Sequence, residues 1–185
     1  MRRKRTLLHP NSNKYLENAL RAGFQLEFEG AFAAMAANEN VYTFSGLNVP
    51  RVTSTTNLDV VAVVGRHILV GEMKNYHGFL RGGISDSIWS AGSKGQYLRI
   101  RNPIKQNRFH VDSLTRAMIS SGIVMRGLRI LDYVVVPDVC KLEVPEVLKR
   151  VVISQTRWEA LIAELSYFNK DGVRLDVINK FREWV

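Results

Sequence analysis

Hydrophobic residues gather in the middle of the chain in runs that predict β-strands. The densest pattern covers residues 58–64 and 67–75, two runs rich in β-branched residues that Gly65-Arg66 separates. A two-residue interruption of this kind predicts a tight β-hairpin. Both faces of the predicted hairpin are largely apolar, so we expect other layers of the protein to cover it on both sides.

The flanking segments predict helices and further strands. The loop expected over residues 46–57 contains Pro50 and a Ser/Thr/Asn cluster. Further strands are predicted at residues 41–44, 87–90, 97–101, 129–136 and 151–153. Helices are predicted at residues 11–23, 26–37, 103–120, 158–168 and 176–184. This order predicts an α/β fold with a central mixed β-sheet flanked by helices.

Length and composition restrict the class of protein. With 185 residues, 46% of them hydrophobic, the chain is long enough for one sizeable core and too apolar to be intrinsically disordered. We expect a basic N-terminal segment with a short helix over residues 1–23 and a single domain over residues 24–185. Cys140 is the only cysteine, which excludes a disulfide framework.

The sequence shows no sign of a membrane or secretory protein. The longest apolar run, residues 60–64, is far shorter than the ~20 residues that span a bilayer. The basic start of the chain is not followed by the apolar stretch of a secretory signal. We therefore expect a cytoplasmic protein without a membrane partner.

The charge balance indicates a polyanionic partner. There are 26 Lys and Arg residues against 17 Asp and Glu residues, a formal net charge of +9. Arg99, Arg101, Lys105 and Arg108 cluster around the start of the helix predicted at Pro103, where phosphates bind well. The alternative is a solvated basic face.

Two carboxylates and a lysine form the candidate site. A hairpin with a two-residue loop places Asp59 directly opposite Glu72, with their Cβ atoms roughly 5 Å apart. Lys74 follows two residues later and lies on the same face. Facing like charges are unfavourable unless one acid is protonated or a divalent cation such as Mg²⁺ bridges them. The alternative is a plain salt bridge of Lys74 with one of the acids.

These residues carry a resemblance to a known family. Asp59 followed by Glu72-Met-Lys74 resembles the PD-(D/E)xK nuclease signature. Lys74-Asn-Tyr-His77-Gly, then Trp89, then the segment Asn-Pro-x-x-Gln-x-x-x-His at residues 102–110 are similar to the nuclease-related domain (NERD) family. The resemblance covers about residues 27–118. It implies a restriction-endonuclease-like core and Mg²⁺-dependent cleavage of phosphodiester bonds, with Mn²⁺ able to substitute and DNA favoured over RNA.

The resemblance also implies residue roles. Asp59 and Glu72 would ligate the metal, Lys74 would position water and stabilise charge, and Gln106 would orient the site. The family usually has an acid after a glycine on its first core helix. Here the order is reversed, and we assign Glu29 rather than the nearby Glu27 because its apolar spacing matches.

Three further expectations follow for partners. His77 lies at the expected mouth of the site and would contact nucleic acid, with a structural or solvent-facing role as the alternative. Nucleases of this kind often need two sites for two strands, so a homodimer would fit. The alternative function is a non-catalytic nucleic-acid-binding module of a larger DNA-processing or defence assembly.

Overall fold

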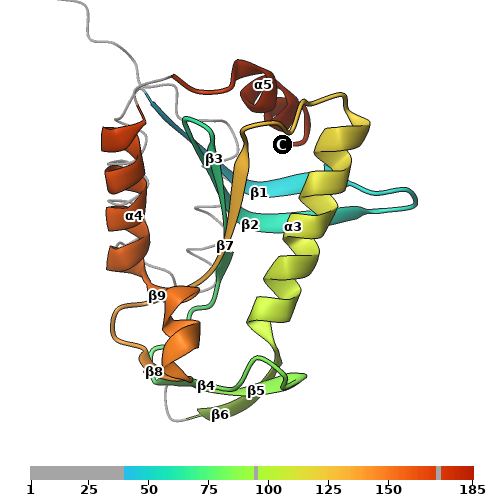
Figure 1. Cartoon of the computed structure of the whole chain (residues 1–185). Helices are drawn as coiled ribbons and strands as arrows, with labels where there is room; N and C mark the ends of the chain where they lie inside the picture. The colour runs from blue at the N-terminus through green and yellow to red at the C-terminus, as the bar shows by residue number, and fades with distance from the viewer. Residues whose placement is uncertain (1–39, 94–95, 170–171) are drawn as a thin grey trace, which may run out of the picture.

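The computed structural model describes residues 40–93, 96–169 and 172–185, and a five-stranded mixed β-sheet forms its centre (Figure 1). The first three strands are antiparallel neighbours, and the last two run parallel to the third. In spatial order the strands are β1 (Val41–Pro50), β2 (Thr55–Val64), β3 (His67–Met73), β7 (Arg129–Val136) and β9 (Val152–Ser154). Both helices predicted before residue 40, with Glu27 and Glu29, lie outside the described residues, as does the basic segment 1–23.

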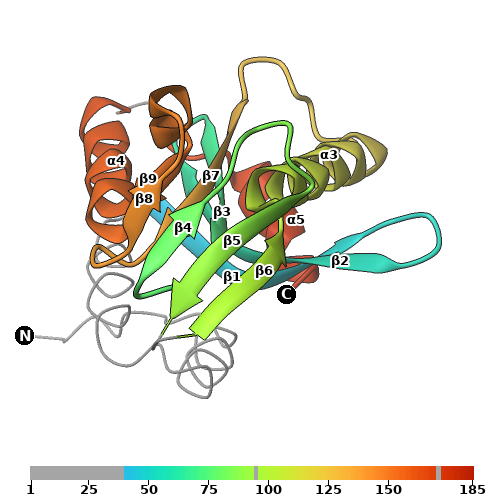
Figure 2. The ribbon, with the colours of Figure 1, turned by 90° about the horizontal axis from the view of Figure 1, so that it is seen from below.

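A second, four-stranded sheet lies across one end of the first (Figures 1 and 2). Its order is β6 (Gln96–Arg101), β5 (Ile88–Ser93), β4 (Phe79–Arg81) and β8 (Lys141–Glu143). The strands predicted near residues 87–90 and 97–101 are confirmed. The other two were not predicted, because three residues are too few to show a periodic pattern.

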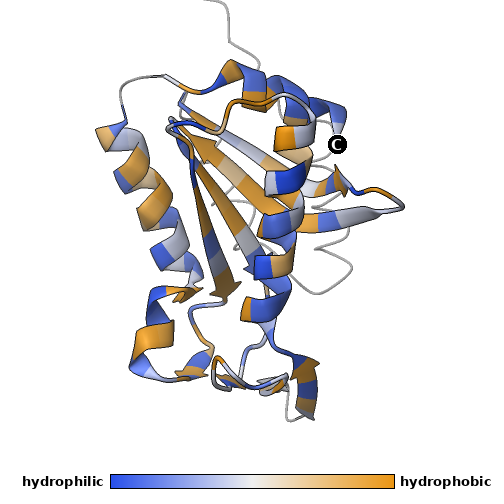
Figure 3. Ribbon diagram, turned by 45° about the vertical axis from the view of Figure 1, so that its right-hand side comes forward, coloured by the Kyte–Doolittle hydropathy of each residue, from blue (hydrophilic) through white to orange (hydrophobic). Residues whose placement is uncertain are grey.

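Helices cover both faces of the five-stranded sheet. They are α3 (Pro103–Ser120), α4 (Gln155–Phe168), α5 (Leu175–Glu183) and the short 3₁₀ helix η1 (Glu146–Arg150). One core lies between the sheet, α3 and α5, and another between the sheet and α4. Figure 3 shows the strands as mostly hydrophobic between these layers. The predicted α/β class is confirmed, and the arrangement is consistent with a restriction-endonuclease-like core.

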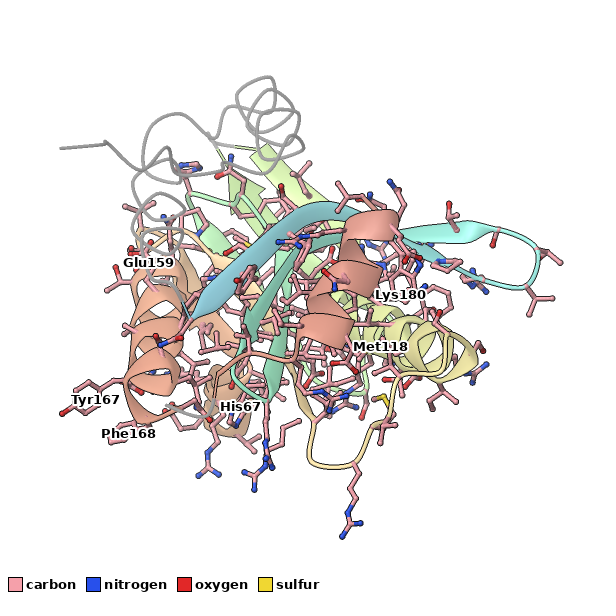
Figure 4. All side chains as sticks on the ribbon, turned by 90° about the horizontal axis from the view of Figure 1, so that it is seen from above. His67, Met118, Glu159, Tyr167, Phe168 and Lys180 are labelled. Atoms are coloured by element: carbon pink, nitrogen blue, oxygen red, sulfur yellow. The ribbon has the colours of Figure 1, made fainter. Side chains whose placement is uncertain are left out.

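Each helix buries one face, as its sequence predicts. On α4, Trp158 and Ile162 are buried against the sheet, whereas Tyr167 and Phe168 are 74% and 77% exposed and point away from the fold at its end (Figure 4). Helix α3 has the predicted bounds. None of the helices described here is long and apolar enough to cross a membrane.

The central hairpin has the predicted register. Val64 pairs with His67, and the pairing continues to Val60 and Gly71. Gly65, the first residue of the two-residue loop, has φ of +57°, a left-handed conformation that glycine adopts without steric cost.

The loop predicted over residues 46–57 is wrong, because most of it belongs to β1 and β2. Pro50 is tolerated as the last residue of an edge strand, where no ladder hydrogen bond is needed from it. Leu47 and Leu58 are fully buried, and the backbone N–H of Asn48 donates to the carbonyl of Trp184 at 2.9 Å. Packing against the C-terminal helix therefore stabilises this two-stranded ribbon, although its Ser, Thr and Asn residues are typical of a loop.

The side-chain alternation of this ribbon reverses at one point. Phe44 and Leu47 of β1 face the same core, as do Leu58 and Val61 of β2, although each pair is three residues apart. Gly46, with φ of +63°, lies at the reversal on β1. On β2 the reversal coincides with Asp59, which is absent from the ladder pairs between Leu58 and Val60.

Helix α3 is fixed at its start by two buried asparagines. Asn102 caps the helix: its Oδ1 accepts hydrogen bonds from the N–H groups of Ile104 and Lys105, and its Nδ2 donates to carbonyls of the β4–β5 loop. Asn107 Nδ2 donates to the carbonyls of Val70 at 3.0 Å and Tyr133 at 2.9 Å, on neighbouring strands β3 and β7. The helix is thereby held over the end of β3.

The β4–β5 loop is packed against Trp89, which gives a test of this junction. A Cβ atom at Gly82 would lie 2.3 Å from the Trp89 ring, whereas one at Gly83 would lie 3.2 Å from the movable Asp86 carboxylate. We expect Gly82→Ala to lower the free energy of unfolding by about 1–3 kcal/mol through overpacking. Gly83→Ala is the control and should cost less in the same urea titration. Equal losses would contradict the packing argument.

Candidate active site

The two predicted carboxylates and the lysine meet where β2 separates from β3. Ladder pairing ends at Val60 and Gly71, one step short of the predicted pair of Asp59 with Glu72. Asp59 Oδ2 instead accepts a hydrogen bond from the backbone N–H of Met73 at 2.8 Å. The aspartate side chain thus accepts a hydrogen bond from a backbone donor of β3 just beyond the last ladder pair. The Asp59 carboxylate also lies close enough to Glu72 for the charge of Glu72 to affect the pKa of Asp59.

Glu72 is a buried carboxylate held between two basic side chains. It is 1% exposed, and its Oε1 accepts a hydrogen bond from Lys74 Nζ at 2.6 Å. Its Oε2 lies 3.2 Å from Nδ1 of His110, although the two atoms lack the alignment of a hydrogen bond. The plain salt bridge considered as an alternative is therefore present, and among the described residues one oxygen of Glu72 has no hydrogen-bond partner.

The two acids have opposite pKa shifts. Burial, and next the negative charge of Glu72, raise the pKa of Asp59 from 3.8 to about 6, although the Met73 N–H favours ionisation. Burial also opposes ionisation of Glu72, but its contacts with His110 and Lys74 outweigh it and lower the pKa of Glu72. Glu72 therefore carries the fixed negative charge, while Asp59 titrates near neutral pH.

Helix α3 supplies the remaining side chains of the site. Gln106 Oε1 accepts a hydrogen bond from Lys74 Nζ at 3.3 Å, so the ammonium group connects Glu72 to the helix. Gln106 and His110 are four residues apart and lie on the same side of α3. The Asn-Pro-x-x-Gln-x-x-x-His segment thus combines a helix cap with two side chains that reach the β3 residues.

His110 is the site residue to which sequence reasoning gave no role. It has no partner histidine at a metal-ligand spacing, and it was noted only as the end of the matched segment. The available signal was its spacing of four from Gln106, which places both side chains over one stretch of sheet. The docking role of Asn107 has no comparable signal, because its acceptors are backbone carbonyls of distant strands.

The predicted nucleic-acid-binding residues are all exposed, and they lie on α3, on β6 and in the segment between β3 and β4. Lys105 Nζ donates to the carbonyl of Ser85 in the β4–β5 loop, and Arg108 Nε lies 3.9 Å from Asp132 of β7. Arg99 and Arg101 lie on β6 of the second sheet. His77 lies in the segment that joins β3 to β4.

The donor set suits a hard divalent cation with an open coordination sphere. Glu72 Oε2 is buried without a hydrogen bond, and within the described residues Asp59 Oδ1 has no donor. Mg²⁺ typically takes one or two protein carboxylates and completes its shell with water and phosphate oxygens. No cluster of three or more His, Cys, Asp or Glu ligands occurs in the described part of the chain. Glu29, the further acid expected from the sequence, lies outside the described residues.

These features define an α/β protein with a carboxylate–lysine site at the end of a central hairpin. The model of the nuclease-related domain (NERD) family matches residues 22–137, which is more than half of the 185 residues. The chain belongs to the nuclease-related domain family, and placement in the PD-(D/E)xK superfamily is consistent with this. Comparisons with curated proteins and with solved structures gave no match.

The raised pKa of Asp59 gives a pH-dependent stability. Between about pH 4 and pH 6 the folded chain binds more protons at Asp59 than the unfolded chain, so this residue makes stability fall as pH rises. The Asp59→Asn variant has no such loss. We expect the difference in free energy of unfolding, Asp59→Asn minus wild type in EDTA, to be larger at pH 7 than at pH 4 by up to about 3 kcal/mol.

Urea denaturation at the two pH values measures this difference. Asp112→Asn, a change at an exposed acid of α3, is the control and should follow the wild type within about 0.5 kcal/mol. The explanation is wrong if the gap between Asp59→Asn and wild type is the same at pH 4 and pH 7.

Proposed function

We propose that the protein is a Mg²⁺-dependent nuclease that hydrolyses phosphodiester bonds, most readily as a DNA endonuclease. The observation that carries this proposal is the Asp59, Glu72 and Lys74 site in a chain of the nuclease-related domain family. Mn²⁺ should substitute for Mg²⁺, since both accept oxygen ligands. Its location in the cytoplasm and its assembly as a homodimer stay predictions.

In the proposed mechanism the two acids share one task. Asp59 and Glu72 would hold the cation through the oxygens that have no hydrogen bond. A bound divalent cation supplies a water of lowered pKa and neutralises charge on the phosphate. Glu29 is proposed as a further acid of the site.

Lys74 and Gln106 act on the reacting phosphate and the water. The side chain of Lys74 is 18% exposed and its ammonium group is held by two hydrogen bonds, which limits the reorganisation needed to stabilise developing negative charge. Gln106 would orient it from α3. The nucleic-acid backbone around the site would be bound by Arg99, Arg101, Lys105, Arg108 and His77.

A non-catalytic nucleic-acid-binding module is the second candidate. The direct salt bridge of Lys74 with Glu72 favours it, since a stable ion pair needs no metal to offset the buried charge. The raised pKa of Asp59 favours the nuclease, because the ion pair leaves this second acid without sufficient compensation.

Cleavage assays separate the two candidates. Supercoiled plasmid, linear duplex and single-stranded DNA are incubated with the protein and Mg²⁺, Mn²⁺ or EDTA. We expect nicking or linearisation of plasmid that EDTA abolishes, and a loss of about 10²–10³-fold in rate for Lys74→Ala. Lys149→Ala, at an exposed lysine of η1, is the matched control and should cleave as the wild type does. Cleavage by Lys74→Ala at the wild-type rate would indicate a contaminant, and binding without cleavage would favour the module.

Metal binding has a readout that does not depend on activity. At about 100 times the dissociation constant, Mg²⁺ should stabilise the wild type by about 2.7 kcal/mol, measured by thermal unfolding. Asp59→Asn should lose most of this gain, and the wild type should need more Mg²⁺ at pH 5 than at pH 7.5 because the cation must displace the Asp59 proton. Asp112→Asn should keep the full gain. Equal stabilisation of both variants would place the cation elsewhere.

A further inference from the structure

The outer face of the four-stranded sheet lies outside the cluster of Asp59, Glu72 and Lys74, although it carries two of the predicted nucleic-acid-binding residues, Arg99 and Arg101. The inner face is a core, in which Leu80, Trp89 and Ala91 are buried against the five-stranded sheet and α3. The opposite face, turned toward the viewer in Figure 2, carries Phe79, Arg81, Ile88, Ser90, Gly92, Tyr97, Arg99, Arg101, Lys141 and Glu143.

Register arranges these residues in successive rows about 7 Å apart. The first row is aromatic and runs Lys141, Phe79, Gly92, Tyr97 across the four strands. The second row contains two arginines and runs Glu143, Arg81, Ser90, Arg99. Ile88 and Arg101 form the third. An aromatic strip therefore lies beside an arginine strip on one flat surface.

The aromatic row is exposed and also held in place. A Cβ atom at Gly92 would lie 2.6 Å from the Phe79 ring, so only glycine lets that ring lie across β5. The Phe79 and Tyr97 ring centroids are 5.8 Å apart. Tyr97 is 64% exposed, yet its hydroxyl hydrogen-bonds Ser90 Oγ at 2.6 Å. An exposed ring fixed in this way has little conformational entropy left to lose when it binds a ligand.

The cations of the face are not all neutralised. Arg81 forms an ion pair with Glu143 and lies over the Phe79 ring at 5.4 Å. Arg99 and Arg101 are exposed and form no ion pair with any described residue. The face carries four cationic side chains and one carboxylate, which complements a chain of phosphates.

We propose that this outer face binds single-stranded DNA, with a base stacked on Tyr97 and phosphates on Arg99 and Arg101. Exposed rings beside cations are the combination that binds unpaired strands, because every base has a π-face and a duplex hides it. The choice of DNA over RNA follows from the proposed function, and the oligo-U strand in the test below distinguishes the two.

The inference rests on the proposed function and deepens it, because it assigns the enzyme an unpaired strand as part of its substrate. The chain connects the two surfaces directly at strands β4 and β6. Phe79 follows Lys74 by five residues, and Arg101 immediately precedes the Asn102 cap of the helix that carries Gln106. A strand on the outer face would therefore lie next to the segments that border the candidate site.

The test measures binding without cleavage. The full chain carrying Lys74→Ala is titrated in EDTA against a labelled 20-nucleotide oligo-dT strand, a duplex of equal length and oligo-U RNA, by fluorescence anisotropy at several salt concentrations. Tyr97→Ala should weaken binding of the DNA strand by roughly 5- to 150-fold. Tyr97→Phe, which keeps the ring, should stay within a few-fold of the parent.

Charge variants test the arginine row. Arg99→Ala with Arg101→Ala should lower the slope of log affinity against log salt by about 1.4. The matched control removes two exposed arginines of α3 and the loop beyond it, Arg116→Ala with Arg126→Ala, and should leave the slope unchanged. Melting temperatures within a few degrees of the parent identify variants that remain folded.

Several results would overturn the inference. They are duplex binding as tight as single-strand binding with no effect of Tyr97→Ala, tighter binding of RNA than of DNA, or self-association through the β6 edge without oligonucleotide binding. A wild type that never cleaves DNA but still shows Tyr97-dependent strand binding would refute the proposed nuclease and leave this inference standing. Cleavage that survives with no Tyr97 effect would refute the inference alone.

Discussion

The buried charge of Glu72 is the constraint on which the rest of the candidate site depends. An isolated carboxylate that is 1% exposed would cost several kcal/mol, so its neighbours must offset that cost. Lys74 does so from just beyond the end of β3. His110, on a helix and 38 residues further along the chain than Glu72, has its Nδ1 3.2 Å from Oε2 of Glu72. The position of α3 over the end of β3 is therefore a condition for a stable site as well as a packing outcome.

Two asparagines set that position with hydrogen bonds that apolar contacts cannot supply. Asn102 directly follows β6 of the second sheet, caps α3 and donates hydrogen bonds to carbonyls of the β4–β5 loop. Asn107 binds carbonyls of two adjacent parallel strands and fixes the helix along the sheet. Hydrophobic packing alone would let a helix slide along the sheet, whereas these directional bonds select one placement, in which Gln106 and His110 meet the residues of β3.

The sequence predicts best what local periodicity determines. The register of the central hairpin and both ends of α3 are confirmed, because a two-residue turn and a proline at the helix start are local signals. The reversal at Gly46 and Asp59 is not visible in such a pattern, and neither are the three-residue strands of the second sheet. The prediction that Asp59 pairs directly with Glu72 assumed that the antiparallel ladder continues without interruption. The ladder ends one step earlier, and the aspartate accepts a hydrogen bond from the N–H of Met73 instead.

The charge balance of the site gives the strongest physical reason to expect a cation there. Lys74 donates its hydrogen bond to Glu72 rather than to Asp59. Asp59 is therefore stabilised by one hydrogen bond, from the backbone N–H of Met73, and by the more distant positive charges of Lys74 and His110. A pKa raised to about 6 means that these contacts do not offset burial and repulsion. A site serving stability alone would gain from an amide at this position. An acid whose ionisation costs stability near neutral pH is the kind of compromise that functional sites show, and the proposed cation would remove that cost.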